Sequence, residues 1–229
     1  MSFICVDRIP GLLDLPDPGT EFGEEACGDA AYYWPTGTAL TVRFLDGPPD
    51  LRARVMAAAG AWTEHANLSL TVVDTGPADL RITFRGAGNW SALGTTSRNP
   101  RSYPADHPTM CLAEAGTAGP SRLARIARHE FGHAIGLVHE HSSPAAGIAW
   151  NRPVVLNTLA GPPNFWSMAD VAVNVFDRYH TTRTQYTAFD PHSIMLYAFP
   201  PEWTLDGRTF PENVELSATD RAFAAQIYP

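Results

Sequence analysis

The stretch from His129 to His139 reads HEFGHAIGLVH and is the part of the sequence that decides the fold. Two histidines four residues apart on a helix project from nearly the same side, so the imidazoles of His129 and His133 can bind one zinc ion. Glu130 lies next to the first of these histidines, and its carboxylate can take a proton from a metal-bound water. The pattern predicts a helix that carries a metal site and an adjacent general base.

Gly136 and His139 make this pattern specific. A straight helix would carry position 139 away from the metal, but Gly136 can adopt the left-handed conformation that ends the helix and turns the chain back. His139 can then supply a third ligand. Three neutral imidazoles leave an open coordination position, which is typical of catalytic zinc. A bare HExxH also occurs by chance in buried helices, whereas the full string is far more specific. We expect one Zn²⁺ per chain.

The composition excludes several classes of protein. The chain has 229 residues, of which 45% are hydrophobic and 17% charged, enough for one large domain or two small lobes with a sizeable core. All sixteen basic residues are arginines, so Schiff-base enzymes, Walker-A nucleotide binding and protein kinases are excluded. The net charge of −8 argues against nucleic acid or an anionic membrane as partner. The apolar runs are too short to span a bilayer.

The first residues carry no recognisable targeting signal. Residues 1–31 are rich in Pro, Gly and acidic side chains and are interpreted as an irregular N-terminal arm. They lack a basic start followed by a long apolar stretch, so we expect no secretory signal in this chain. Localisation stays open between the cytoplasm, another export route, and secretion with the signal removed. Three cysteines, Cys5, Cys27 and Cys111, are too few for a disulfide framework.

Hydrophobic patterning predicts strands and helices in alternation. Period-two alternation indicates strands at 40–45, 68–72 and 80–84, and a further short strand is expected at 109–112. A first helix starts at Asp50 as N-cap, and a second starts at Ser121 and ends at Gly136. Capping-box patterns predict two more helices, after Ser167 and after Ser217. Residues 85–108 and 140–165 are interpreted as loops because they are crowded with Gly, Pro, Asn and Ser.

A second motif, DPHSIMLY at Asp190–Tyr197, lies downstream of the histidine string. Taken alone it is a buried turn with a core methionine. Together with the first string it resembles the Met-turn of the metzincins, a clan of zinc endopeptidases. The form Ser-Ile-Met-x-Tyr, and Glu140 directly after the third histidine, are similar to the astacin family. The resemblance covers about residues 32–229, strongly at 129–141 and 190–197.

The resemblance implies an α+β fold of the metzincin type. A single catalytic domain would span 32–229. Its N-terminal lobe, about 32–139, would hold a twisted mixed sheet and two long helices. Its C-terminal lobe, about 140–229, would be smaller, irregular and partly helical, and zinc would lie at the floor of the cleft between the lobes.

The resemblance also implies roles for single residues. Met195 would form an apolar floor beneath the zinc. Tyr197 would be a possible fifth ligand that turns to stabilise the oxyanion, and a phenol beside a metal is a suitable hydrogen-bond donor for that charge. The family's edge strand binds substrate as an added antiparallel strand, which we place at Thr109, Met110, Cys111 and Leu112. The expected partner is therefore an extended peptide, bound by a monomer.

Some features depart from the family and predict a divergent, microbial branch. No Arg follows Glu140 at the usual spacing, and the four disulfide cysteines of the animal enzymes have no counterparts. Glu140 would pair with an arginine if no new N-terminal amine is available. His141 is either near the metal ligands or, as we favour, a polar loop residue. The stretch from Cys27 to Asp29 either occupies the zinc or, as we favour, is an ordinary loop.

The sequence thus predicts a zinc endopeptidase in which Glu130 is the general base and Tyr197 helps to hold the oxyanion. One alternative is a dedicated maturation peptidase that acts on one peptide in a biosynthetic or toxin pathway. The other is a protein that binds zinc without turnover, which the presence of Glu130 disfavours.

Overall fold

The computed structural model describes residues 30–143, 145–177 and 187–229. It begins with a short 3-10 helix, η1, at Ala30–Tyr32. The expected N-terminal arm therefore lies almost entirely outside the described residues. So do Cys5 and the stretch from Cys27 to Asp29, and the predictions made for them stay predictions.

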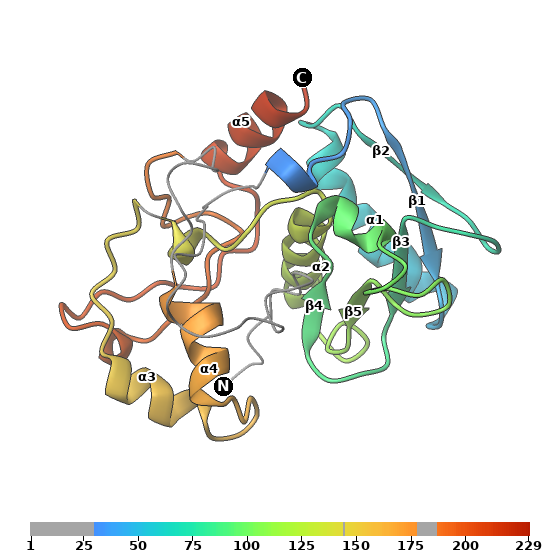
Figure 1. Ribbon diagram of the computed structural model, residues 1–229. Helices are drawn as coiled ribbons and strands as arrows, with labels where there is room; N and C mark the ends of the chain where they lie inside the picture. Colours follow the sequence, from blue (N-terminus) through green and yellow to red (C-terminus); the bar gives the residue numbers. More distant parts are fainter. Residues whose placement is uncertain (1–29, 144, 178–186) are drawn as a thin grey trace.

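A five-stranded mixed sheet with the order β2-β1-β3-β5-β4 forms one half of the molecule (Figure 1). Strands β2, β1, β3 and β5 run parallel to one another, and β4 is antiparallel to β5. The strands are β1 (Ala39–Phe44), β2 (Ser69–Val72), β3 (Leu80–Thr83), β4 (Asn89–Ser91) and β5 (Met110–Leu112). The mixed sheet and the α+β class are as the sequence predicts.

The alternation in β1 explains which face of the sheet is buried. Leu40, Val42 and Phe44 are buried, and the residues between them are more exposed. Strand β3 is instead buried along its whole length, and Arg81 within it donates to the backbone carbonyls of Ala78, Tyr103 and His107. These bonds satisfy a buried guanidinium, which would otherwise be costly.

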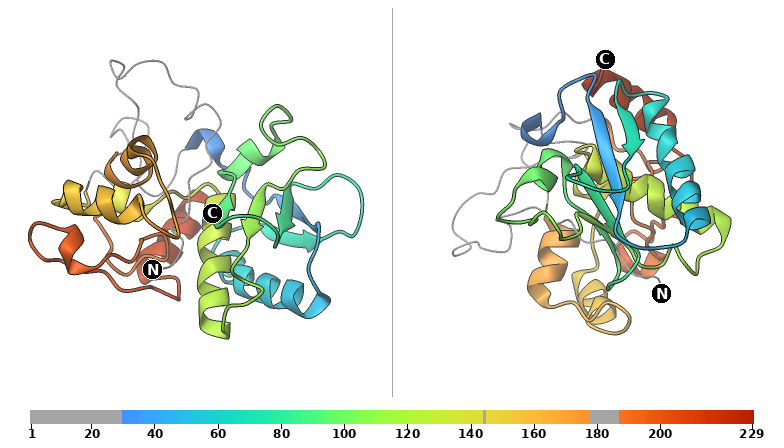
Figure 2. Two further views of the ribbon diagram at one scale, coloured as in Figure 1. Left: turned by 90° about the horizontal axis from the view of Figure 1, so that it is seen from below. Right: turned by 90° about the vertical axis from the view of Figure 1, so that its right-hand side faces the viewer.

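Two helices of fifteen residues each, α1 (Pro49–Thr63) and α2 (Pro120–Ala134), pack against each other and cover one face of the sheet (Figure 2). Their N-caps are Pro48 and Gly119, so the expected caps Asp50 and Ser121 are wrong by two residues. The reason is that proline fits the first helical position, where its fixed φ is helical and no backbone N–H is needed.

The second half of the chain is less regular. Its helices are η3 (Glu140–Ser142), α3 (Arg152–Leu159), α4 (Met168–Val171), the π-helix η4 (Ala172–Phe176), η5 (Pro201–Trp203) and α5 (Ala218–Ile227). Both expected capping boxes, at Ser167 and Ser217, are present. Helix α3 falls in a stretch that the sequence indicated as a loop, because Pro153 suggested a break but lies in the first turn of the helix. None of the described helices has the length and apolar character needed to cross a membrane.

Two large hydrophobic clusters and a small one around Trp90 and Cys111 form the core of the described residues. The first lies between the sheet, α1 and α2, and also takes in Ile194, Met195 and the C-terminal helix α5 through Phe223 and Tyr228. The second joins α3, α4, η4 and the segment from Leu196 to Phe210. Helix α5 packs with the first cluster, although it follows the residues of the second cluster in the sequence. The single catalytic domain with two lobes stays a prediction.

Candidate metal centre

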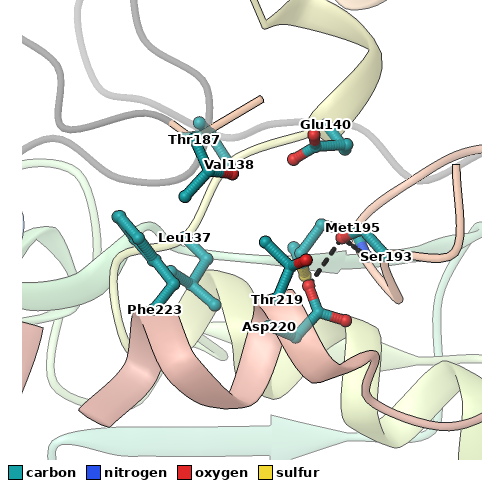
Figure 3. Close-up of a pocket in the computed structure, with 9 residues that line it drawn as sticks. All are labelled: Leu137, Val138, Glu140, Thr187, Ser193, Met195, Thr219, Asp220 and Phe223. Carbon is teal, nitrogen blue, oxygen red and sulfur yellow. Dashed lines mark hydrogen bonds between the residues drawn. The ribbon is translucent and has the colours of Figure 1, made fainter. Parts of the chain in front are cut away.

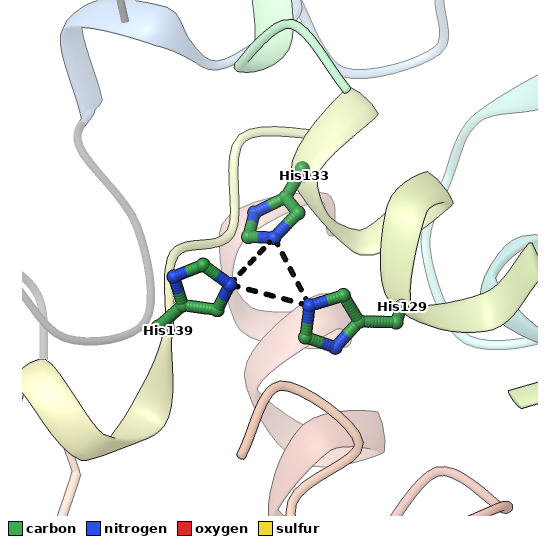
Figure 4. A group of neighbouring side chains, drawn as sticks. All are labelled: His129, His133 and His139. Carbon is green, nitrogen blue, oxygen red and sulfur yellow. Dashed lines mark hydrogen bonds between the residues drawn. The ribbon is translucent and has the colours of Figure 1, made fainter. Parts of the chain in front are cut away.

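Three histidines converge where α2 ends (Figure 4). His129 and His133 lie one turn apart on α2, and His139 follows after the helix has ended. Their Nε2 atoms lie 3.2–3.3 Å from one another. All three side chains are buried. In the part of the chain that the structure describes, this is the one group of three or more His, Cys, Asp or Glu residues that could hold a metal ion.

The turn that brings His139 back is a Schellman motif centred on Gly136. Gly136 has φ +95° and donates its N–H to the carbonyl of His133 at 2.8 Å, while Leu137 donates to the carbonyl of Gly132 at 2.9 Å. These two hydrogen bonds define a common way of ending a helix, and it requires one residue in the left-handed conformation. A β-carbon at Gly136 would also approach the Tyr33 ring to 2.8 Å. The backbone role expected for Gly136 is therefore present in the fold.

The spacing of the three nitrogens fits zinc. A tetrahedral zinc ion with Zn–N bonds of about 2.0–2.1 Å places its ligand nitrogens roughly 3.3–3.4 Å apart. The Nδ1 atoms of His129 and His133 donate to the carbonyls of Ile194 and Leu137, each at 2.8 Å. Because a carbonyl can only accept, these bonds place the proton on Nδ1 and leave the Nε2 lone pairs directed at a common point. Together with Nε2 of His139, which lies 3.2–3.3 Å from both, these lone pairs form a site that suits a cation.

Electrostatics keep the first ligand neutral. Burial lowers the pKa of His129 well below its ordinary 6.5, and the neighbouring His133, His139 and Arg125 lower it further. The hydrogen bond to Ile194 opposes this effect but does not reverse it. A neutral imidazole is the form that binds a metal, so the site is prepared to do so at neutral pH.

Glu130 is a buried residue of the same helix. It directly follows His129 on α2 and is 1% exposed. A carboxylate is rarely buried to this extent unless it has a partner or a function. Its position next to a metal ligand is the one that the motif requires of a general base.

Met195 and its turn lie beneath the metal helix. The Met195 side chain is 2% exposed and packs against Gly132 and Trp62, so it shares a core with α2. Its carbonyl accepts from the backbone N–H of Glu140 at 3.1 Å. The carbonyl of the preceding Ile194 is the acceptor for His129. The turn is therefore tied directly to one metal ligand and to the residue that follows another.

Helix α5 fixes the Met-turn through Asp220 (Figure 3). The Asp220 carboxylate accepts from the hydroxyl of Ser193 at 2.7 Å, from the N–H of Ile194 at 2.8 Å and from the N–H of Ser217 at 2.9 Å. Glu140 contributes from the other side, because its Oε1 accepts from the N–H of Asp190 at 2.8 Å. The sequence pointed to a different partner for Glu140, an arginine, and that pairing stays a prediction.

Tyr197 and His141 lie together beside the third histidine. The Tyr197 ring centroid is 4.2 Å from that of His139 and 6.3 Å from that of His129. His141 is 1% exposed and lies against Tyr197 with ring centroids 4.3 Å apart. His141 is therefore a buried neighbour of a metal ligand and not the polar loop residue that the sequence favoured. The missed signal was its position two residues after His139, which places it in the same turn.

The expected edge strand is wrong. Strand β5, which contains Met110, Cys111 and Leu112, is paired on both sides, with β3 and with β4, and Thr109 directly precedes it. The strand at that edge of the sheet is β4, Asn89–Ser91. It lies in the stretch 85–108 that the sequence indicated as a loop, because three residues are too few for alternation to be visible. Cys111 is a buried thiol.

Comparison with known proteins gives matches to solved structures and matches to curated sequences. Myroilysin is 38% identical in sequence, with a TM-score of 0.84, and the match covers 89% of this chain and 98% of that one. A second myroilysin structure is 35% identical, with 98% of both chains covered and a TM-score of 0.65. The hatching enzyme zinc-protease HCE-1 of medaka, Oryzias latipes, is 17% identical over 90% of this chain and 98% of that one. Its TM-score of 0.58 shows the shared fold alone.

Curated relatives match over shorter stretches. Human matrix metalloproteinase-20 is 28% identical over 138 residues, which are 49% of this chain and 26% of that protein. Human matrix metalloproteinase-19 is 34% identical over 120 residues, which are 46% of this chain and 24% of that protein. The chain thus matches about a quarter of the length of these relatives. No protein-family model matches it.

Proposed function

Because the chain belongs, with myroilysin, to the metzincin zinc proteases, we propose that it is a zinc endopeptidase with Glu130 as its general base. The observation that carries this proposal is the convergence of three histidine Nε2 atoms within 3.3 Å of one another, on and just after the helix that also carries the buried Glu130. His129, His133 and His139 would hold the zinc. When bound, the ion acts as a Lewis acid that lowers the pKa of a coordinated water and polarises the scissile carbonyl.

Glu130 would move the proton in this reaction. Its carboxylate takes the proton of the attacking water and delivers it to the leaving amine, so one group serves first as base and then as acid. Burial of Glu130 supports this role, because a carboxylate with 1% exposure is shielded from bulk water during the proton transfer. Its place on the rigid helix α2, next to His129, fixes the direction from which it acts.

Tyr197 would stabilise the charge that develops on the carbonyl oxygen. A phenolic hydroxyl held close to the metal ligands donates a hydrogen bond where the oxyanion forms. The packing of the Tyr197 ring on His139 supports this assignment. Met195 would form the apolar floor of the centre, in line with its contact with Gly132 beneath the ligands.

The substrate would be an extended peptide that pairs with the sheet. The two edge strands of the sheet are β2 and β4, and β4 is the one that contacts α2, the helix that carries two of the ligands. An added strand gives affinity through main-chain hydrogen bonds, independent of the side chains of the peptide. This placement keeps the mode of binding that the sequence predicts and changes the strand.

The test of the proposed function combines metal analysis with one substitution. The purified chain should carry about one zinc, chelation should abolish cleavage of a peptide library, and added zinc should restore it. Glu130→Gln keeps the size of the side chain and removes the base, so kcat should fall at least about a hundredfold. Zinc content should stay the same because Glu130 is not a ligand. Glu64→Gln, an exposed position after α1, is the control. Turnover by a metal-free sample, or by Glu130→Gln at the normal rate, would refute the proposal.

A further inference from the structure

The His141 ring packs against Tyr197 and against the metal ligand His139. Its centroid lies 4.3 Å from that of Tyr197, with the two planes at 31°, and 5.2 Å from that of His139, with the planes at 25°. These are the separations of offset-stacked rings. The Tyr197 ring thus contacts both His139 and His141, which are two residues apart in the chain.

The orientation of the His141 ring is itself fixed. Its Nε2 lies 3.0 Å from the carbonyl oxygen of Asn174, and because a carbonyl only accepts, Nε2 is the donor. The rings of Trp150 and Phe199 approach it edge-on, at 6.2 and 5.8 Å and with interplanar angles of 88° and 90°. Rotation of the ring would break the hydrogen bond and both edge contacts.

The acceptor of this hydrogen bond belongs to an unusual element. Asn174 lies in the π-helix η4, which ends where Asp177 adopts an extended conformation. Carbonyls in the last turn of a helix lack helical partners, and His141 supplies one. Asn174 is also anchored, because its side-chain amide donates to the carbonyl of Asp170 at 2.8 Å. His141 therefore connects η4 to the rings of Tyr197 and His139.

We propose that His141 is a positioning residue that holds the Tyr197 ring beside the metal centre. The inference rests on the role proposed for Tyr197 above. A phenol that is already held in place loses no conformational entropy when the oxyanion forms. Loss of this preorganisation should slow the chemical step. His141 acts through Tyr197, so its whole effect on kcat has to pass through the Tyr197 hydroxyl.

Two substitutions separate the ring contact of His141 from its hydrogen bond. His141→Phe keeps a ring against Tyr197 but removes the donor to Asn174, whereas His141→Gln keeps an amide donor near the position of Nε2 but removes the ring. Each should lower kcat of the zinc-loaded chain by about ten- to a hundredfold with KM nearly unchanged, and by no more than Tyr197→Phe does. His107→Gln, at an exposed histidine, is the control and should change nothing.

The decisive measurement repeats both substitutions in a Tyr197→Phe background. Without the hydroxyl there is nothing left to position, so neither His141 substitution should lower kcat further by more than about twofold. If the losses multiply, or if the single His141 variants are silent, the inference is overturned while the zinc-peptidase assignment stands. If Tyr197→Phe itself is silent, the role of Tyr197 is overturned and the inference with it. The phenylalanine variant carries the test if His141→Gln does not fold.

A readout on the metal-free chain separates positioning from a general effect on folding. The protein contains seven tyrosines, and 3-fluorotyrosine labelling gives each a ¹⁹F resonance, with that of Tyr197 assigned by its loss in Tyr197→Phe. Both His141 variants should shift or broaden the Tyr197 resonance and leave the other six in place. An unchanged Tyr197 resonance, or displacement of all seven, would contradict the proposed contact.

Discussion

The sulfur of Met195 occupies the space that a β-carbon on Gly132 would need. Gly132 lies inside α2, one residue before the second metal ligand, and the Met-turn packs against the helix at this point. The same hypothetical β-carbon would lie 3.1 Å from Trp62 Cζ2, and Trp62 is held by its indole donating to the carbonyl of Arg128 at 2.8 Å. The glycine of the HEFGH string is thus explained by packing and not by the metal.

Gly132→Ala should destabilise the protein although alanine is the better helix former. The helix gains about 1 kcal/mol in propensity, but overpacking a closed core costs about 1–3 kcal/mol. Met195 is 2% exposed and has little room to move, so we expect a net loss of free energy of unfolding and weaker zinc binding. Urea denaturation and zinc competition measure the two effects.

Gly60→Ala is the matched control for this substitution. Gly60 also lies inside a long helix, α1, but a β-carbon there would meet nothing within 4 Å. It should therefore raise the free energy of unfolding by up to about 1 kcal/mol and leave zinc affinity unchanged. Equal effects of the two substitutions would show that the contact with Met195 costs nothing.

Gly136→Ala should release the third ligand. A residue with a β-carbon pays about 1–2 kcal/mol to adopt the left-handed conformation, and here it would also clash with Tyr33. The chain can relieve this strain by unwinding the turn, which moves His139 away from the other two ligands. Zinc affinity measured by competition with a chelator should fall by at least about tenfold.

Gly37→Ala separates backbone strain from the effect on the metal. Gly37 has φ +80°, but a β-carbon there would meet nothing within 4 Å. It should lower stability by about the same 1–2 kcal/mol with zinc affinity intact. Zinc affinity that falls equally in both variants would mean that the turn at Gly136 is not specific to the metal centre.

The sequence was informative where a pattern is long or its chemistry is strict. Strand β1 was predicted because Leu40, Val42 and Phe44 alternate, and the end of α2 because Gly136 has one conformational role that few residues can take. The histidine convergence followed from helix periodicity plus that one turn. These features depend on neighbours in sequence, which a single chain displays.

The rest depends on pairing between distant segments. The position of β4 at the sheet edge follows from its antiparallel pairing with β5, which residues 89–91 alone do not reveal. The burial of His141 depends on Trp150, Asn174 and Phe199, which reach it from three later segments. A polar residue in a loop-like stretch is interpreted as exposed unless such contacts are known.

Acid should destabilise the metal-free protein through His129. Its pKa is lowered by burial, so the folded chain keeps the imidazole neutral while the unfolded chain binds a proton below about pH 6.5. Stability contributed by this group is therefore complete above that pH and is lost as the pH falls, with a slope of up to about 1.4 kcal/mol per pH unit. Denaturation of the metal-free chain between about pH 7.5 and 5.5 measures the slope. His129→Gln should flatten it, and an equally steep profile in that variant would assign the effect to another group.

Asp220→Asn should loosen the Met-turn from helix α5. The carboxylate accepts three hydrogen bonds, and although burial raises the pKa of Asp220, donors from Ser193, Ile194 and Ser217 favour its ionised form. An amide has one acceptor oxygen, so at least one buried donor loses its partner, at a cost of about 1–3 kcal/mol. Since the carbonyl of Ile194 orients His129, we expect lower zinc affinity as well as lower stability.

Asp170→Asn is the control that isolates this connection. Asp170 closes an equivalent capping box with Ser167 at the start of α4, but it is only half-buried and does not contact the Met-turn in the bonds of this box. Its loss should cost about 0.5–1 kcal/mol, as capping residues do, and leave the zinc affinity unchanged. Calorimetric zinc titration of the two variants decides the question. Zinc affinity that stays at the wild-type level in Asp220→Asn would show that the Met-turn keeps its position without α5, and that Ile194 orients His129 independently of the C-terminal helix.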